Sequence, residues 1–106
     1  MRFGPWTYDP DAMVLYQATG QMVKLSSREK RLLTLFLSHP GRVFSRQQLL
    51  DVLHPDGDVE VYDRAIDSAI ARLRRRIEID PAAPKILKTV YGEGYVFNAN
   101  VRRLDH

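Results

Sequence analysis

The stretch RAIDSAIARLRRRI, residues 64–77, decides how this chain folds. Its large aliphatic residues recur at spacings of four, three and four positions: Ile66, Ile70, Leu73 and Ile77. On a helix with about 100° between successive residues, these four side chains lie within about 60° of one another and form one buried stripe. Asp63 is a candidate N-cap, and Asp80-Pro81 ends the pattern, so the sequence predicts a helix over residues 63–79.

The face of this helix away from the stripe carries small and basic residues. The residues on or beside it are Arg64, Asp67, Ser68, Ala71, Arg72, Arg74 and Arg75. Small side chains let a helix approach the base edges in the DNA major groove, and guanidinium groups donate to guanine or to phosphate. The alternative is a solvated amphipathic helix whose arginines pair with neighbouring acidic residues.

The composition is that of one globular domain with a basic half. The chain has 106 residues, a net charge of +3 and no cysteine, which excludes disulfides and a thiol nucleophile. Residues 41–63 carry a net charge of −3 and residues 64–106 a net charge of +4, which favours a polyanionic partner. No long apolar run or signal peptide is visible, and we expect a cytoplasmic protein.

Upstream of this helix, the pattern predicts a small sheet followed by two helices. Short strands separated by Asp, Pro and Gly fall within residues 2–8, 13–16 and 21–25, and Trp6 and Tyr8 alternate as if they face the core together. The sequence Ser26-Ser27-Arg28-Glu29 is a capping box that begins a helix ended by residues 39–41. Ser45 and Gln48 form a second capping box, and His54-Pro55 ends that helix.

Downstream, two β-prone segments flank Gly92-Glu93-Gly94 and predict a hairpin over residues 86–97, followed by a frayed tail at 101–106. The order of elements predicts an α+β winged helix-turn-helix over residues 1–100. It has an N-terminal antiparallel sheet, three helices and a C-terminal β-hairpin wing. In that architecture the third helix enters the major groove, and the wing touches the neighbouring backbone or minor groove.

Two segments resemble a known family. Residues 64–77 resemble the recognition-helix signature of OmpR/PhoB-type response-regulator effector domains, and residues 88–95, KTVYGEGY, resemble that family's wing motif. Residues 25–29 and 40–46 resemble the entries to its first and second helices. The resemblance spans residues 13–98 and implies an N-terminal sheet of four strands.

The resemblance also implies the function of a bacterial two-component transcription regulator. Such a domain binds double-stranded DNA at direct repeats as head-to-tail pairs, with no catalysis and no cofactor. A sensor kinase acts on it only through a receiver domain, which is absent from this chain. We favour an isolated effector domain over a natural protein that lacks a receiver.

Carried over by position, the resemblance assigns roles to individual residues. The expected base-reading residues are Asp67, Ser68, Ala71 and Arg72. The expected backbone contacts are Arg64, Arg74, Arg75, Lys88 and Thr89. The wing residues are Tyr91, Gly92, Gly94 and Tyr95. Tyr91 stands where some members carry an arginine that enters the minor groove, and positions 69 and 71 are both Ala, which favours thymine methyl contacts over hydrogen bonds.

The acidic segment 54–62 falls where family members contact RNA polymerase, and Asp56, Asp58 and Glu60 are the candidate surface. The alternative is a polar loop whose charge keeps it away from DNA. A competing interpretation of the whole chain is a protein-interaction winged helix that docks polymerase or a partner and binds DNA weakly and generically. The three histidines have no metal-ligand spacing, so we expect no metal site.

Overall fold

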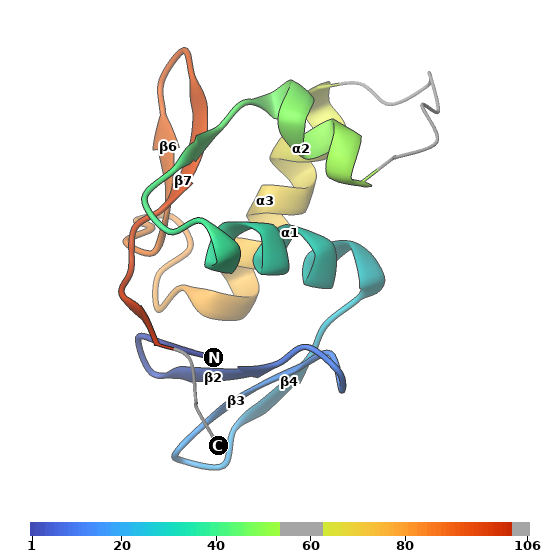
Figure 1. The fold of residues 1–106 in the computed structure, drawn as a ribbon. Coiled ribbons are helices and arrows are strands. Elements are labelled where there is room, and N and C mark those ends of the chain that lie inside the picture. The colour runs from blue at the N-terminus through green and yellow to red at the C-terminus, as the bar shows by residue number, and fades with distance from the viewer. Residues whose placement is uncertain (54–62, 103–106) are drawn as a thin grey trace.

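The computed structural model describes residues 1–53 and 63–102 of the chain. In these residues, three helices pack between a larger sheet and a smaller one (Figure 1). The helices are α1 (Ser27–Ser38), α2 (Arg46–Leu53) and α3 (Asp63–Ile77). This is the α+β winged helix-turn-helix that the order of elements predicts.

The larger sheet is antiparallel and includes both ends of the described chain. Its strands, in spatial order, are β4 (Met22–Lys24), β3 (Val14–Gln17), β2 (Trp6–Asp9), β1 (Arg2–Phe3) and β8 (Val101–Arg102). The prediction of a frayed tail from residue 101 is therefore wrong for its first two residues. They form β8, because Val101 pairs with Phe3 and packs against the core. A fifth strand thus joins the four that the sequence predicts.

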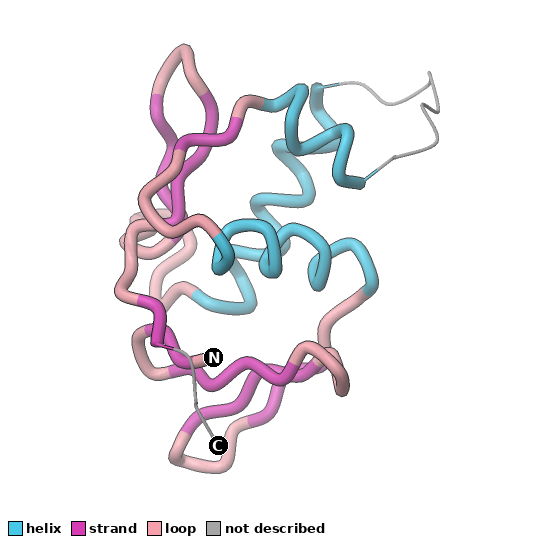
Figure 2. The backbone as a smooth tube through the Cα atoms, viewed as in Figure 1, coloured by secondary structure: helices cyan, strands magenta, loops and turns pink. Residues whose placement is uncertain are grey.

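The smaller sheet carries the predicted wing. The hairpin consists of β6 (Leu87–Val90) and β7 (Gly94–Phe97), joined by a turn over residues 91–93. A third strand, β5 (Val43–Phe44), pairs antiparallel with β7, so the segment between α1 and α2 anchors the base of the wing. The tube in Figure 2 shows the hairpin extending beyond this base.

Local capping bonds set where the helices begin and end. Ser26 and Glu29 form both bonds of the predicted capping box at α1, and Ser45 and Gln48 form the equivalent reciprocal pair at α2. The third helix ends at Ile77 rather than at the predicted residue 79. The carboxylate of the next residue, Glu78, accepts backbone N–H groups at residues 85–87 instead, and this ties the helix end to the start of β6.

The predicted stripe of α3 is the centre of the core. Its four aliphatic side chains are each at most 1% exposed, as are Leu32, Leu33 and Phe36 of α1. Trp6 and Tyr8 of β2 also face this core, as their alternation predicts. The indole Nε1 of Trp6 donates a buried hydrogen bond of 3.0 Å to the carbonyl oxygen of Ile77, so the larger sheet contacts the last turn of α3.

The wing depends on Gly94, and an alanine there tests this dependence. A Cβ atom at this position would collide with the carbonyl oxygen of Phe44 and lie 2.9 Å from Cα of Ser45, at a φ of +144°. We expect Gly94→Ala to lower the free energy of unfolding by about 3 kcal/mol or more, through overpacking added to backbone strain. Urea denaturation measures this loss.

Gly92→Ala is the matched control. It also has a positive φ, of +77°, but a Cβ there meets nothing within 4 Å. Strain alone predicts a cost of about 1–2 kcal/mol. If the two alanine substitutions lowered the free energy of unfolding equally, the close approach of β5 to β7 would be contradicted.

Candidate nucleic-acid interface

The outward face of α3 presents arginines next to small side chains. Ser68, Arg72 and Arg75 are exposed, and Ala71 is half-buried between them. Neither the Arg72 nor the Arg75 guanidinium donates to any residue in the described part of the chain. Among the described residues, these two cations therefore have no partner. The side chain of Arg64 lies outside the described residues.

One flank of α3 faces the wing. The Nε of Arg74 donates to the carbonyl oxygen of Leu87 and its Nη2 donates to Oγ1 of Thr89, both at 2.9 Å. The same guanidinium lies 5.5 Å from the ring centroid of Tyr95. Arg74, an expected backbone contact, therefore links α3 to both strands of the wing.

Thr89 keeps a donor for a ligand. Its hydroxyl oxygen accepts from Arg74, and a hydroxyl that accepts still has its own proton to donate. Thr89 is half-buried and its neighbour Lys88 is exposed, so both are accessible to solvent. Arg74 thus acts on this part of the surface by orienting Thr89.

Asp67 of α3 binds side chains of both α2 and β7. Its Oδ1 accepts a 2.9 Å bond from Nε of Arg46 in α2 and a 2.5 Å bond from the hydroxyl of Tyr95 in β7. The hydrogen bond from Tyr95, together with Arg46, lowers the pKa of the Asp67 carboxyl, so it is ionised at neutral pH. Burial, reinforced by the Asp67 carboxylate, raises the pKa of the Tyr95 hydroxyl.

The other flank of α3 faces α1. Arg76 Nε forms a 3.1 Å ion pair with Oε2 of Glu29, whose side chain is only 9% exposed. Next to this pair, Ser68 and Arg72 line a hollow of about 220 Å³ together with Ser26 and Arg28 at the start of α1. The base-reading candidates Ser68 and Arg72 thus lie at the edge where α3 meets α1.

The wing residues divide into an exposed tip and a buried base. Tyr91 is 93% exposed and Gly92 forms the turn beside it. Gly94 and Tyr95 are buried at the start of β7, where Gly94 lies against β5 and Tyr95 bonds Asp67 of α3. The prediction grouped these four residues, and the structure leaves only the first two open to a partner.

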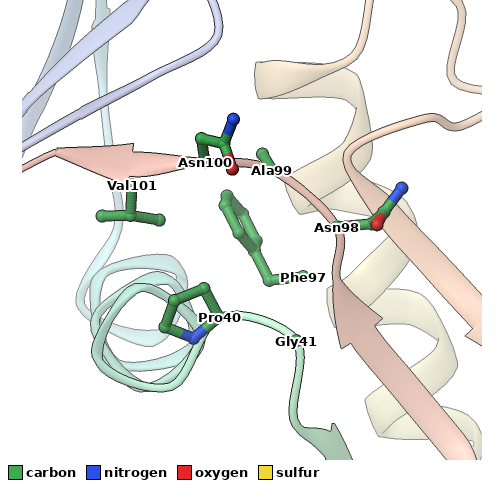
Figure 3. A pocket seen from close by; sticks show the side chains of 7 residues that line it. All are labelled: Pro40, Gly41, Phe97, Asn98, Ala99, Asn100 and Val101. Atoms are coloured by element: carbon green, nitrogen blue, oxygen red, sulfur yellow. The ribbon is translucent and has the colours of Figure 1, made fainter.

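A second hollow, of about 630 Å³, lies away from these residues (Figure 3). Phe97 and the segment 98–101 line it opposite Pro40 and Gly41, and the N–H of Gly41 donates to the carbonyl oxygen of Phe97. None of the predicted site residues lines it.

The remaining observations concern the part of the chain that the structure describes. It contains no cluster of metal-ligating side chains and no helix that is long and apolar enough to cross a membrane. The predicted polymerase-contact residues Asp56, Asp58 and Glu60 lie outside it.

Sequence reasoning missed two residues that shape the surface. Arg46, in the first turn of α2, and Glu29, the capping residue of α1, each bind a residue of α3 that is distant in sequence. The partner of Tyr95 could have been anticipated, because a buried tyrosine hydroxyl usually needs a hydrogen-bond partner, and here it is Asp67.

A third helix with a basic outer face beside a hairpin wing defines a winged-helix nucleic-acid-binding domain. Comparison with known proteins gives its family. The family described as "Transcriptional regulatory protein, C terminal" matches residues 20–97. The chain belongs to this family, the DNA-binding domains of response regulators of the OmpR/PhoB type, which are not enzymes.

Individual relatives agree. The chain is 45% identical over 100 residues to the regulatory protein VirG of Agrobacterium tumefaciens, covering 94% of this chain and 37% of VirG. The solved DNA-binding domain of RstA from Klebsiella pneumoniae, in complex with the RstA box, is 32% identical with a TM-score of 0.76, covering 92% and 95% of the two chains. The response regulator DrrB of Thermotoga maritima is 30% identical with a TM-score of 0.80, covering 92% and 43%. The chain thus spans about two fifths of VirG and DrrB.

An alkaline titration tests the environment of Tyr95. Burial and the Asp67 bond raise the pKa of Tyr95, and burial above all raises the pKa of Tyr8. A pKa that is higher in the folded state than the unfolded value of about 10 stabilises the fold below that pH. This stability is lost as the pH rises through the folded value. We expect Tyr95→Phe to remove one late step from the ultraviolet titration of tyrosinate and to reduce the alkaline loss of stability.

Tyr8→Phe serves as the comparison, because it removes the other late step and leaves that of Tyr95. A late component that is unchanged in Tyr95→Phe would contradict the raised pKa of Tyr95 in the folded protein.

Proposed function

We propose that this chain is the sequence-specific, double-stranded DNA-binding domain of a bacterial two-component transcription regulator. The observation that carries the proposal is the outward face of α3, where Arg72 and Arg75 are exposed beside Ser68 and Ala71. A helix with small residues between free guanidinium groups fits the major groove. The wing is bonded to the same helix through Arg74, so both elements meet one duplex in a set geometry.

One structural neighbour supports the proposal. RstA from Klebsiella pneumoniae is described as a DNA-binding domain in complex with its RstA box, and its fold matches 92% of this chain. The binding unit extends from residue 1 to β8, which ends at Arg102, and it acts in the cytoplasm and on the nucleoid when bound.

We assign the contacts as follows. Arg72 reads a base edge, and Ser68 and Ala71 let the helix approach, with the Ala71 methyl group against thymine. Arg75, Arg64, Lys88 and the Thr89 hydroxyl contact phosphates. Arg74 supports the wing, which modifies its expected role as a direct contact. Tyr91 and Gly92 at the wing tip approach the neighbouring backbone.

Two finer elements complete the proposal. Binding to direct repeats joins two copies as a head-to-tail pair, and a sensor kinase controls the pairing through a receiver domain in the full-length regulator. The acidic segment with Asp56, Asp58 and Glu60 contacts RNA polymerase. The competing function is a protein-docking winged helix with weak, generic DNA binding.

Selection of duplexes from a random DNA pool separates the two functions. Fluorescence anisotropy then compares the selected duplex with a scrambled one across a salt series. Three to five phosphate contacts predict a log–log slope of about −3 to −4.5. We expect a direct repeat with half-sites about one helical turn apart, bound well above the scrambled control. Equal, weak, salt-sensitive binding to both duplexes would favour the protein-docking function.

Arg72 and Arg75 form a matched pair of substitutions on one face. We expect Arg72→Ala to cost about 1–3 kcal/mol on the selected DNA and to relax preference at one base pair. We expect Arg75→Ala to weaken selected and scrambled DNA alike and to reduce the salt slope by about one unit. Repeating the selection with each variant measures both effects. An Arg72→Ala variant with unchanged base preferences would remove Arg72 from the base-reading set.

A further inference from the structure

Tyr95 is a wing residue whose burial and bonding partners are not those of a side chain that contacts DNA directly. It is only 5% exposed, yet two guanidinium groups lie over its ring. The Cζ atom of Arg46 is 5.7 Å and that of Arg74 is 5.5 Å from the ring centroid. Its hydroxyl, held in this position, donates to Oδ1 of Asp67. One phenol thus connects α2, α3 and the wing.

The bonds to Asp67 all use one oxygen. Arg46 and Tyr95 both donate to Oδ1, and no described residue donates to Oδ2. The Asp67 side chain remains 46% exposed. An ionised carboxylate with one oxygen held and the other open has a fixed orientation and a spare acceptor. The exocyclic amine of cytosine is the major-groove donor that such an acceptor reads.

Tyr95 is better suited than Arg46 to hold this carboxylate. The Arg46 side chain is 42% exposed, so it can exchange its bond for one to a phosphate. The phenol is buried on a strand that pairs on both edges, with β5 and β6. Its hydroxyl therefore keeps one position, and the carboxylate is oriented before any DNA arrives, which reduces the entropy lost on binding.

We propose that Tyr95 is a positioning residue for base recognition. From the wing it fixes one oxygen of Asp67, so that the other accepts the amine of a cytosine and sets the preference at one base pair. The inference rests on the proposed function, because it concerns sequence preference within the same interface. Tyr95 itself does not touch DNA.

Tyr95→Phe separates this role from packing. The phenylalanine keeps the ring near both Arg46 and Arg74 and removes only the hydroxyl. Tyr8→Phe is the matched control, because Tyr8 lies in the larger sheet, away from the wing, and its hydroxyl also has a single partner, Thr34 at 3.0 Å. Both variants are tested for folding by urea denaturation.

The experiment measures the affinity of each protein for the selected duplex, for a scrambled duplex and for duplexes with each single base pair changed. For Tyr95→Phe we expect discrimination at one C·G pair to fall on the order of tenfold, the size of one hydrogen bond to a charged group. Scrambled-DNA affinity and its salt slope stay at wild-type values. Tyr8→Phe keeps the wild-type preferences. On an Asp67→Ala background, Tyr95→Phe has no further effect on discrimination.

Two results would overturn the inference while leaving the proposed function intact. One is a Tyr95→Phe variant with wild-type base preferences. The other is an equal loss of affinity for every duplex, which indicates a general structural role. If the wild-type protein itself prefers no duplex, the proposed function fails, and the inference fails with it. The wild-type measurement alone distinguishes that case.

Discussion

The burial of one aliphatic stripe orients the charged side chains of α3. Four side chains of α3, each at most 1% exposed, fix the rotation of this helix about its own axis. A helix is stiff, so once one face is buried the direction of every other side chain follows. One flank meets the wing and the start of α2, the other meets α1, and the arc between them faces outward (Figure 1).

This rotation assigns different tasks to arginines that look equivalent in the sequence. Residues 64–77 contain five of them. Arg74 bonds the wing, and Arg76 neutralises Glu29 at the start of α1. Arg72 and Arg75 face outward. The charge that assembles the domain and the charge that a polyanion meets are therefore carried by different members of one run, and the net charge overstates the second.

Local rules predicted the elements of this fold well. The capping boxes at Ser26 and Ser45 and the α3 stripe each involve neighbours within one or a few helical turns, so their signals appear in short windows. The parts that were missed join distant residues. Val101 pairs with Phe3, and Asp67 meets residues 21 and 28 positions away. Such contacts leave no periodic trace. For the same reason the face of α3 could be predicted from spacing, but the division of its arginines between the wing, α1 and solvent could not.

The bond from Trp6 to Ile77 has a consequence for how the domain can be observed. Trp6 is the only tryptophan of the chain, is 4% exposed, and donates its indole N–H to the last turn of α3. Indole emission responds to hydrogen bonding and to solvent. The protein therefore contains its own fluorescent reporter at the end of α3. Without any label, its emission shows whether that helix remains packed against the sheet when a ligand occupies the outer face.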